Sequence, residues 1–278
     1  MKKVAVIQDL SSFGKCSLTA AIPVLSVMGV QPTPLPTAVL SAQTDYPSFF
    51  YEDLTTKMPH FTTEWQKFNT SFDGIYTGFV TGREQIDNIF AFLQAFYTSE
   101  TLLLVDPVMG DSGEAYKLFT EDMLGRMRAL VKQADVITPN VTESCLLTGL
   151  SYDKLYSYRE SADFMQALQG VGQELQQKTE ASVIITGVNP PGTNTIGNMF
   201  VDATQAQFNA TAFNGKNYSG TGDLFASVLM GSLLRGDSVA TGITLAEDFL
   251  LQAIADTTRA GTPEIEGVNF ERYLRMLL

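Results

Sequence analysis

The chain has 278 residues, of which 45% are hydrophobic and 17% are charged. This composition supports a sizeable core and excludes a chain that stays disordered through low hydrophobicity and high charge. The formal net charge of −12 at pH 7 argues against nucleic acid or anionic lipid as a partner, because a negative surface repels both.

Short apolar runs alternate with helical patterns along the chain. Residues 4–7 predict a buried strand, and residues 14–28 predict a helix that Gly29 ends. Further strands are predicted at residues 73–76, 102–105, 136–138 and 182–186, a hairpin at 195–202 and 206–213, and the last helices at 222–235 and 238–259. The helices between these strands are expected to begin with capping boxes at Thr81 with Glu84 and at Ser157 with Glu160, and with a cap at Thr120.

This alternation predicts an α/β fold with a central, mostly parallel sheet and helices on both faces. Ligands of such folds bind beyond the carboxyl ends of the strands, so one rim is expected to carry Asp9, Thr77, Asp106, Asn140 and Thr186. Residues 32–60, rich in Pro, Thr and aromatic residues, are expected to elaborate that rim. Because the sequence has no evident linker, repeat or low-complexity segment, residues 1–278 are predicted to form a single domain.

The cysteines and the apolar runs indicate in which cellular compartment the protein is expected. Cys16 and Cys145 lie far apart and fit no metal-ligand spacing, which predicts two free thiols in a reducing compartment. The apolar run near the N-terminus is too short for a signal peptide, and no stretch reaches the roughly 18 apolar residues of a membrane span. We therefore expect a cytoplasmic protein with no membrane partner.

The segment 219–226, Ser-Gly-Thr-Gly-Asp-Leu-Phe-Ala, leads directly into an apolar helical pattern. Gly220 and Gly222 flank Thr221, and glycines let the backbone present successive N–H groups to a ligand. With the positive end of the helix dipole, these groups make an anion hole suited to a transferring phosphoryl group. Asp223 follows in the first helical turn, where its carboxylate can take the proton of an attacking hydroxyl. The alternative is an ordinary Gly-rich turn whose Asp begins a helix.

Other patterns argue against competing chemistries. Residues 14–17, Gly-Lys-Cys-Ser, lack the earlier Gly of a P-loop, and Cys16 occupies the position that would hold Mg²⁺. No Gly-x-Gly-x-x-Gly follows the first strand, which argues against a dinucleotide-binding enzyme. The single histidine, His60, excludes a His-rich metal site, and Trp65 is expected to pack in a core.

Several motifs occur in an order that points to a known family. Asp-Pro-Val-Met-Gly at 106–110 and Thr-Pro-Asn-x-x-Glu at 138–143 precede Gly-Thr-Gly-Asp at 220–223. Further matches are Val6-Ile7-Gln8, Phe13-Gly14, Leu40-Ser41, Thr44, Tyr46-Pro47, Tyr76-Thr77-Gly78-Phe79, Asp111 and Leu146-Leu147-Thr148-Gly149. Over most of its length the chain thus resembles the pyridoxal kinase (pyridoxine/pyridoxamine kinase) family of the ribokinase-like superfamily.

The resemblance implies transfer of the γ-phosphoryl group of ATP to the 5′-hydroxymethyl group of vitamin B6. It implies ATP and Mg²⁺ as cofactors, leaves a monovalent cation open, and implies a homodimer. By residue, the resemblance implies Asp223 as the base, with an anion hole formed by Gly220, Thr221 and Gly222. It implies substrate contacts from Asp9, Thr44 and Phe79, and ATP contacts from Asp106, Asp111, Thr186 and Gly187. It also implies that Asn140 and Glu143 organise Mg²⁺, partly through water.

Two carboxylates depart from the family pattern near the expected substrate pocket. Asp9 stands where the best-known pyridoxal kinases have a Ser that contacts the pyridine ring, and Asp45 replaces a Gly. Either carboxylate could pair with a protonated ring nitrogen or a substrate amine, a hypothesis that favours pyridoxamine, or could cap a turn. The alternatives left open are a related kinase for hydroxymethylpyrimidine or a sugar, and a non-catalytic protein that binds vitamin B6 or nucleotide.

Overall fold

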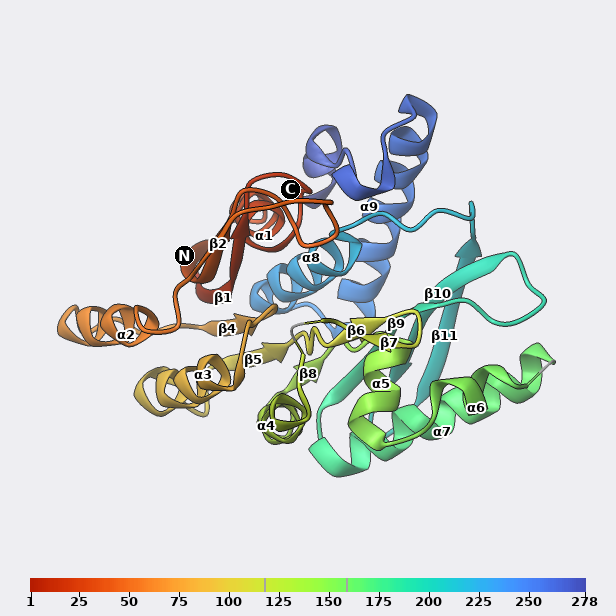
Figure 1. The fold of residues 1–278 in the computed structure, drawn as a ribbon, viewed down its shortest axis with the longest axis horizontal. Coiled ribbons are helices and arrows are strands. Elements are labelled where there is room, and N and C mark those ends of the chain that lie inside the picture. Colours follow the sequence, from red (N-terminus) through yellow and green to blue (C-terminus); the bar gives the residue numbers. More distant parts are fainter. Residues whose placement is uncertain (118, 159) are drawn as a thin grey trace. The chain divides into compact units, whose positions relative to one another are not determined.

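The computed structural model describes residues 1–117, 119–158 and 160–278 and has an α/β fold (Figure 1). In these residues the strands form a nine-stranded sheet in the order β11-β10-β9-β8-β5-β4-β1-β2-β3, and a separate hairpin, β6-β7. The pairs β1–β2, β1–β4 and β8–β9 are parallel, whereas β3, β10 and β11 run antiparallel to their neighbours. The predicted fold class is confirmed.

The strands are β1 (Lys3–Ser11), β2 (Gln31–Leu40), β3 (Tyr51–Asp53), β4 (Gly74–Thr77), β5 (Leu102–Val105), β6 (Gly110–Asp111), β7 (Glu114–Ala115), β8 (Val136–Ile137), β9 (Ser182–Val188), β10 (Thr195–Val201) and β11 (Ala206–Ala212). The α-helices are α1 (Ser17–Val27), α2 (Met58–Lys67), α3 (Arg83–Phe96), α4 (Glu121–Val131), α5 (Val141–Thr148), α6 (Tyr152–Tyr156), α7 (Ser161–Thr179), α8 (Thr221–Arg235) and α9 (Val239–Ala260). Two 3₁₀ helices, η1 (Glu264–Glu266) and η2 (Glu271–Leu277), follow. The predicted hairpin at 195–213 is confirmed as β10 and β11.

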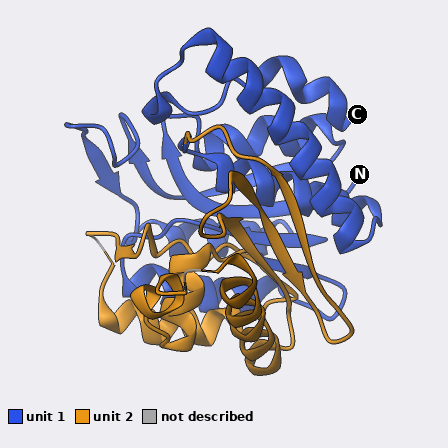
Figure 2. Cartoon of the chain, turned by 90° about the vertical axis from the view of Figure 1, so that its right-hand side faces the viewer, with its two compact units in different colours: residues 1–104, 217–278 blue, residues 105–216 orange. Residues whose placement is uncertain are grey.

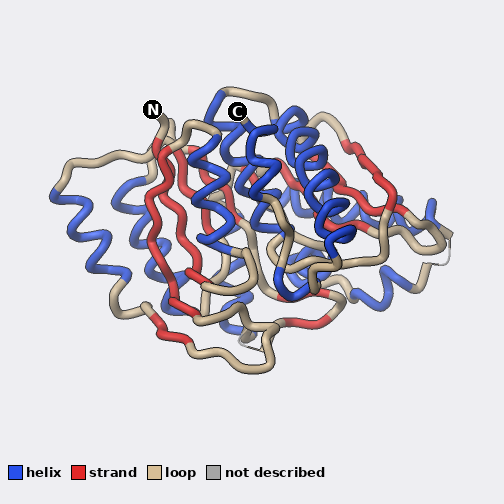
Figure 3. Tube along the Cα trace, turned by 90° about the horizontal axis from the view of Figure 1, so that it is seen from above, coloured by secondary structure: helices blue, strands red, loops and turns tan. Residues whose placement is uncertain are grey.

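The chain divides into two compact units (Figure 2). Unit 1 consists of residues 1–104 and 217–278, and unit 2 consists of residues 105–216. In unit 1, α1 packs on β1 and β2 and also contacts α8, which packs on α9. Helices lie alongside the strands (Figure 3). In unit 2, α7 packs on β9 and β10, and α5 contacts both α7 and β9. The single domain predicted for residues 1–278 stays a prediction.

The proline-rich segment after residue 31 is a strand, which its composition did not indicate. β2 runs parallel to β1, and the Gln31 N–H group donates to the Lys2 carbonyl over 2.8 Å. N–H groups of alternate residues in a strand point to the same side, so the prolines remove donors only from the edge that faces away from β1. That edge pairs with β3 only beyond the last of them. The alternating prolines are Pro32, Pro34 and Pro36.

Two helix starts differ from the sequence-based expectation. The capping box predicted at Thr81 is wrong, because Gly82 precedes α3 and the Thr81 N–H group donates to the Gln85 side chain over 2.8 Å. The box predicted at Ser157 is also wrong: this residue ends α6, where its hydroxyl donates to the Lys154 carbonyl over 2.7 Å. The Thr120 cap of α4 is confirmed, with its side chain accepting from the Met123 N–H group.

The packed interior explains several side chains singled out in the sequence. Trp65 lies among Phe61, Phe72 and Phe92, with ring centroids 5.9, 5.7 and 6.0 Å away, which confirms that it packs in a core. Cys16 and Cys145 are free and buried, as predicted. In the described part of the chain, none of the helices combines the length and the apolar character needed to cross a bilayer.

Candidate active site

The segment predicted to carry the chemistry forms the amino-terminal end of α8 in unit 1. The first main-chain bond of this helix joins the Leu224 N–H group to the Gly220 carbonyl over 3.0 Å. The N–H groups of the preceding turn are therefore not used by the helix and lie at the positive end of its dipole. Gly222 is exposed, with open space at its Cα, and the Thr221 hydroxyl turns back to the Tyr218 carbonyl over 3.1 Å. This helix end has the features of an anion-binding site.

Gly220 is required by both its conformation and its packing. Its φ of +77° lies in the left-handed region that favours glycine. A Cβ atom at this position would lie 2.3 Å from the Lys15 carbonyl oxygen and 3.1 Å from Cys16 Cα. The start of α8 is therefore packed against the backbone of the turn that precedes α1.

Asp223 projects from the first turn of α8, and its side chain is partly exposed. Burial, together with the charge of Asp9, raises the pKa of this carboxyl to about 7, even though hydrogen bonding from the Ser17 backbone lowers it. A carboxylate with a proton affinity close to neutral is suited to act as a general base. The Cys16 thiol, in contrast, has its pKa raised by burial and by the charges of Asp223 and Asp9, which keeps it un-ionised.

Asp9 lies within β1 rather than after it, because β1 continues to pair with β2 as far as Ser11. Its side chain is only 3% exposed, and the Ser11 hydroxyl donates to its Oδ2 atom over 2.6 Å. Burial raises the pKa of Asp9 above its ordinary value, and hydrogen bonding from the Ser11 and Ser17 side chains offsets only part of that rise. Sequence reasoning did not single out either serine as a site residue, although Ser17 ends the Gly-Lys-Cys-Ser motif and Ser11 shortly precedes it.

The turn at residues 14–17 has an unusual backbone conformation and is held by contacts of Lys15. Gly14, Lys15 and Ser17 have φ values of +117°, +48° and +49°, so α1 begins at Ser17 and not at residue 14 as predicted. Non-glycine residues in this region cost on the order of 1 kcal/mol or more each and persist where surrounding structure imposes them. The Lys15 ammonium is engaged by Asn269 at 2.8 Å and by Glu271 at 2.9 Å.

The residues predicted to contact substrate also belong to unit 1. Thr44 is exposed in a turn, where the neighbouring Gln43 side chain donates to Ser219 Oγ over 3.2 Å and accepts from the Asp45 N–H group at 2.8 Å. The turn that carries Thr44 is thus tied to the residue preceding the helix-end glycine. Phe79 follows β4 and is half-buried. The substrate roles of these residues stay predictions.

A second group of predicted site residues lies at the start of α5 in unit 2. Asn140 and Glu143 form a reciprocal capping box: the Asn140 side chain accepts from the Glu143 N–H group at 2.9 Å, and the Glu143 side chain accepts from the Asn140 N–H group at 2.7 Å. Glu143 also accepts from the Met109 N–H group at 3.0 Å, and the Asn140 amide donates to the Gly110 carbonyl over 2.8 Å. The helix start and the loop after β5 are held together by these bonds.

The chemistry of this group suits a hard cation, although the side chains alone do not complete a metal site. Glu143 and Asp106 are both buried, and burial together with the charges of Asp106 and Asp111 raises the pKa of Glu143 well above its ordinary value. Carboxylate oxygens are preferred by Mg²⁺, which usually takes one or two of them and completes its shell with water and phosphate. Across residues 1–117, 119–158 and 160–278 no three His, Cys, Asp or Glu side chains are arranged to hold a metal ion. The Asn140 amide is already engaged at both ends, so it fits a role in holding Glu143.

The remaining predicted ATP contacts lie nearby in the same unit. The Thr186 N–H group donates to the Pro139 carbonyl over 2.9 Å, which brings β9 beside the residue that caps α5. Gly187 is exposed and has a φ of +65°, with open space at its Cα. Asp111 is exposed, and its side chain accepts from the Ser112 N–H group at 2.7 Å. The structure leaves these residues' contacts with ATP as predictions.

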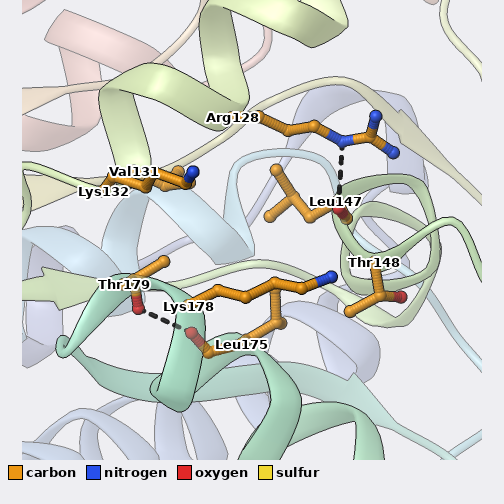
Figure 4. Close-up of a pocket in the computed structure, with 8 residues that line it drawn as sticks. All are labelled: Arg128, Val131, Lys132, Leu147, Thr148, Leu175, Lys178 and Thr179. Atoms are coloured by element: carbon orange, nitrogen blue, oxygen red, sulfur yellow. Dashed lines mark hydrogen bonds between the residues drawn. The ribbon is translucent and has the colours of Figure 1, made fainter.

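A pocket of about 250 Å³ in unit 2 is lined by none of the predicted site residues (Figure 4). It lies where α4, α5 and α7 end, and its basic side chains sit beside those carbonyl-rich ends. Arg128 donates from Nε to the Leu147 carbonyl over 3.0 Å and from a terminal nitrogen to the Leu146 carbonyl over 2.7 Å. The Arg128 guanidinium thus compensates the partial negative charge of the carbonyl groups at the carboxyl end of α5. The lining residues are Arg128, Val131, Lys132, Leu147, Thr148, Leu175, Lys178 and Thr179.

Comparison with known proteins points to one group of kinases. The family model described as phosphomethylpyrimidine kinase matches residues 13–268. A Bacteroides thetaiotaomicron protein, provisionally described as a phosphomethylpyrimidine kinase and crystallised in a form with pyridoxal, is 38% identical, with a TM-score of 0.89 over 99% of this chain and 95% of that chain. Pyridoxal kinase from Lactobacillus plantarum is 33% identical, with a TM-score of 0.89 over 100% and 97% of the two chains. A hydroxymethylpyrimidine/phosphomethylpyrimidine kinase from Bacillus subtilis is 27% identical over 262 residues, or 93% of this chain and 84% of that protein.

Proposed function

We infer that this chain, which belongs to the phosphomethylpyrimidine kinase family, phosphorylates the 5′-hydroxymethyl group of vitamin B6 with ATP. Membership makes the protein a kinase, a phosphotransferase. Vitamin B6 is favoured as substrate by the 38% identical protein whose crystal form contains pyridoxal and by the 33% identical pyridoxal kinase. The observation that carries the proposal is the end of α8, where unused N–H groups adjoin a carboxyl with a pKa near 7.

In this proposal the anion hole, the base and the substrate contacts all belong to unit 1. The N–H groups of Gly220, Thr221 and Gly222 bind the charge on the phosphoryl group as it transfers, and Asp223 takes the proton of the attacking hydroxyl. Asp9, Thr44 and Phe79 line the substrate pocket in this proposal. The base removes the hydroxyl proton while the oxygen attacks phosphorus. The barrier is lowered because the oxygen gains electron density as the new bond forms, without first becoming a free alkoxide.

The residues proposed for ATP and Mg²⁺ belong to unit 2. Asp106, Asp111, Thr186 and Gly187 are proposed to contact ATP, and Glu143 with Asp106 would hold Mg²⁺ while Asn140 keeps the Glu143 carboxylate in place. Mg²⁺, when bound, neutralises charge on the phosphate oxygens. The buried Asp106 and Glu143 carboxylates support this assignment, because each raises the cost of the other's charge until a cation is present. A homodimer in the cytoplasm remains a prediction of the family resemblance.

Hydroxymethylpyrimidine is the second candidate substrate. It is favoured by the family model and by the Bacillus subtilis relative, which is named for that activity. Both substrates present a hydroxymethyl group on a nitrogen-containing aromatic ring, so the end of α8 would act on either one in the same way. The two candidates therefore differ in the ring pocket and not in the phosphoryl-transfer chemistry.

The direct test is ATP consumption by the purified protein with pyridoxal, pyridoxine, pyridoxamine and hydroxymethylpyrimidine offered separately, with the products identified by mass spectrometry. We expect the highest kcat/KM with a B6 vitamer and a product phosphorylated at the 5′ position. A preference for pyridoxamine would support the hypothesis drawn from Asp9 and Asp45. Turnover of hydroxymethylpyrimidine alone would transfer the assignment to the second candidate.

A further inference from the structure

Gln43 lies in the turn that carries Thr44, a proposed substrate contact. The residue is 8% exposed, whereas Thr44 and Asp45 beside it are exposed. Its main chain is paired on both sides: the N–H group donates to the Phe13 carbonyl over 2.9 Å, and the carbonyl accepts from the Tyr46 N–H group at 3.2 Å. A buried amide is stable only where its polar atoms are paired, so the partners of this side chain show what it holds in place.

The Gln43 amide joins this turn to the start of α8. Its Oε1 atom accepts from the Asp45 N–H group at 2.8 Å, which closes the turn. Its Nε2 atom donates to Ser219 Oγ over 3.2 Å and to the Ile265 carbonyl over 3.3 Å. Because a backbone N–H group only donates and a carbonyl only accepts, these partners fix which end of the amide is oxygen. One planar group thus bonds both the turn and the residue that precedes Gly220.

Ser219 extends this contact to the helix end. Its N–H group donates to the carbonyl of Glu264, a residue of η1, over 3.0 Å, and Gln43 is bonded to the same short helix. A Cβ atom on Gly267 would lie 3.1 Å from the Ser219 carbonyl oxygen, so the backbone is closely packed here. The N–H groups proposed as the anion hole begin one residue later, at Gly220. A shift of Ser219 would therefore move them.

Gly14 leaves room for the path of the Gln43 side chain. A Cβ atom at Gly14 would lie 2.3 Å from Gln43 Cγ and 3.1 Å from Gln43 Cβ. Its φ of +117° also lies in the region that favours glycine. A larger residue at this position would push the Gln43 amide away from its partners. Packing thus accounts for the Phe13-Gly14 pair: the Phe13 carbonyl accepts from the Gln43 N–H group, and Gly14 admits the side chain.

We propose that Gln43 is a positioning residue for phosphoryl transfer: its amide holds the turn that carries Thr44 in a fixed place relative to the amino-terminal end of α8. The substrate hydroxyl and the N–H groups that receive the phosphoryl charge are then presented together. Small displacements matter in such a site, because misplacing a reacting group by about 1 Å can cost about a hundredfold in rate. The inference rests on the proposed roles of Thr44 and of the α8 helix end, and it adds a residue that touches neither reacting group.

The first test is Gln43→Met, which keeps the length of the side chain and removes both its donor and its acceptor. We expect kcat for the preferred B6 vitamer to fall by about tenfold and the KM for the vitamer to rise by about threefold. The KM for ATP should stay within about twofold of wild type, because the residues proposed to contact ATP belong to unit 2. A variant that is merely less stable would not separate the two KM values in this way.

The second test is a double-mutant cycle with Ser219→Ala, which removes only the bond between Ser219 Oγ and the Gln43 amide. In the wild-type background it should lower kcat and raise the vitamer KM by about threefold each, although Ser219 lies outside the substrate turn. In the Gln43→Met background the same change should alter either constant by less than about 1.5-fold, because the bond is already absent. Ser219→Ala alone decides the matter if Gln43→Met does not fold.

Ser232→Ala is the matched control. It removes a buried hydroxyl from the carboxyl-terminal part of α8, where Ser232 Oγ donates to Asp237 Oδ2 over 2.6 Å. This variant should lower the thermal transition and keep kcat and both KM values. Wild-type kcat and vitamer KM in Ser219→Ala, or effects of Gln43→Met and Ser219→Ala that simply add, overturn the inference.

The base variant separates this failure from that of the proposed function. Asp223→Asn is compared with Asp87→Asn, which removes the same charge from the surface of α3, where Asp87 Oδ2 lies 3.7 Å from Arg83 Nε. If Asp223→Asn retains turnover, the base is misassigned whatever the Gln43 variants do. If Asp223→Asn loses turnover and the Gln43 and Ser219 variants behave as wild type, only the positioning role of Gln43 is wrong.

Discussion

At Asp223, burial and one neighbouring charge raise the proton affinity of a carboxyl towards neutral pH, as the proposed role of a base requires. In water this group would be ionised far below pH 7 and would bind a proton too weakly to assist an alcohol. Burial and the charge of Asp9 raise its pKa to about 7, while its partly exposed side chain remains accessible to a ligand. The same surroundings suppress ionisation of Cys16, so one environment favours proton transfer by the carboxyl and disfavours reaction at sulfur.

This environment predicts the pH dependence of turnover. Below the pKa of about 7 the Asp223 carboxyl is protonated and cannot accept a further proton, so kcat/KM should fall about tenfold for each pH unit below that point and level off above it. The profile is measured with the best vitamer at fixed Mg²⁺ and ionic strength. A rate that stays constant down to pH 5 would show that the base is a carboxyl with an ordinary pKa.

At the scale of elements, helix starts organise both groups of candidate site residues, but by different means. The start of α8 has a glycine in left-handed conformation and leaves its N–H groups for a ligand. The start of α5 is closed by the Asn140–Glu143 capping box, which also fixes the loop after β5 through Gly110 and Met109. One helix end is therefore open for binding, and the other holds carboxylates in place.

Replacing the cap of α5 tests this division. Asn140→Ala removes the acceptor for the Glu143 N–H group and the donor to Gly110, and should lower the free energy of unfolding by about 1 kcal/mol and raise the KM for ATP. Thr120→Ala, which removes the cap of α4 in the same unit, should cost about as much stability and leave the KM for ATP unchanged. Equal KM values in both variants would mean that the α5 cap serves stability alone.

At the scale of the whole molecule, the chain divides into two compact units, and the single domain predicted from the sequence stays a prediction. Trp65 is the single tryptophan and lies in unit 1, so its fluorescence reports that unit, while far-UV circular dichroism reports the helices of both. We expect urea unfolding curves from the two signals to coincide, as they do for one cooperative transition. Two separate midpoints would show that the units unfold independently.

The parts that could be predicted from sequence are those in which local pattern and tertiary structure agree. The buried strands and the Gly-Thr-Gly-Asp helix start carry their own signals, because apolar runs and glycines specify those conformations directly. β2 was missed because its prolines lower strand propensity, and only pairing with β1 on the opposite edge makes them harmless. Lys15 has a positive φ angle and packs against Gly220 and Gly267, more than 200 positions away, and no local pattern reports such a contact.

The most direct measurement is single-turnover phosphorylation of the preferred vitamer by Asp223→Asn, alongside a binding titration of the same vitamer. The substitution keeps the shape of the side chain and removes its ability to accept a proton. We predict that the rate falls by about a hundredfold or more while the vitamer still binds, and that Asp87→Asn retains the wild-type rate. Phosphoryl transfer by Asp223→Asn at the wild-type rate would contradict the assignment of the base and, with it, this account of the α8 helix end.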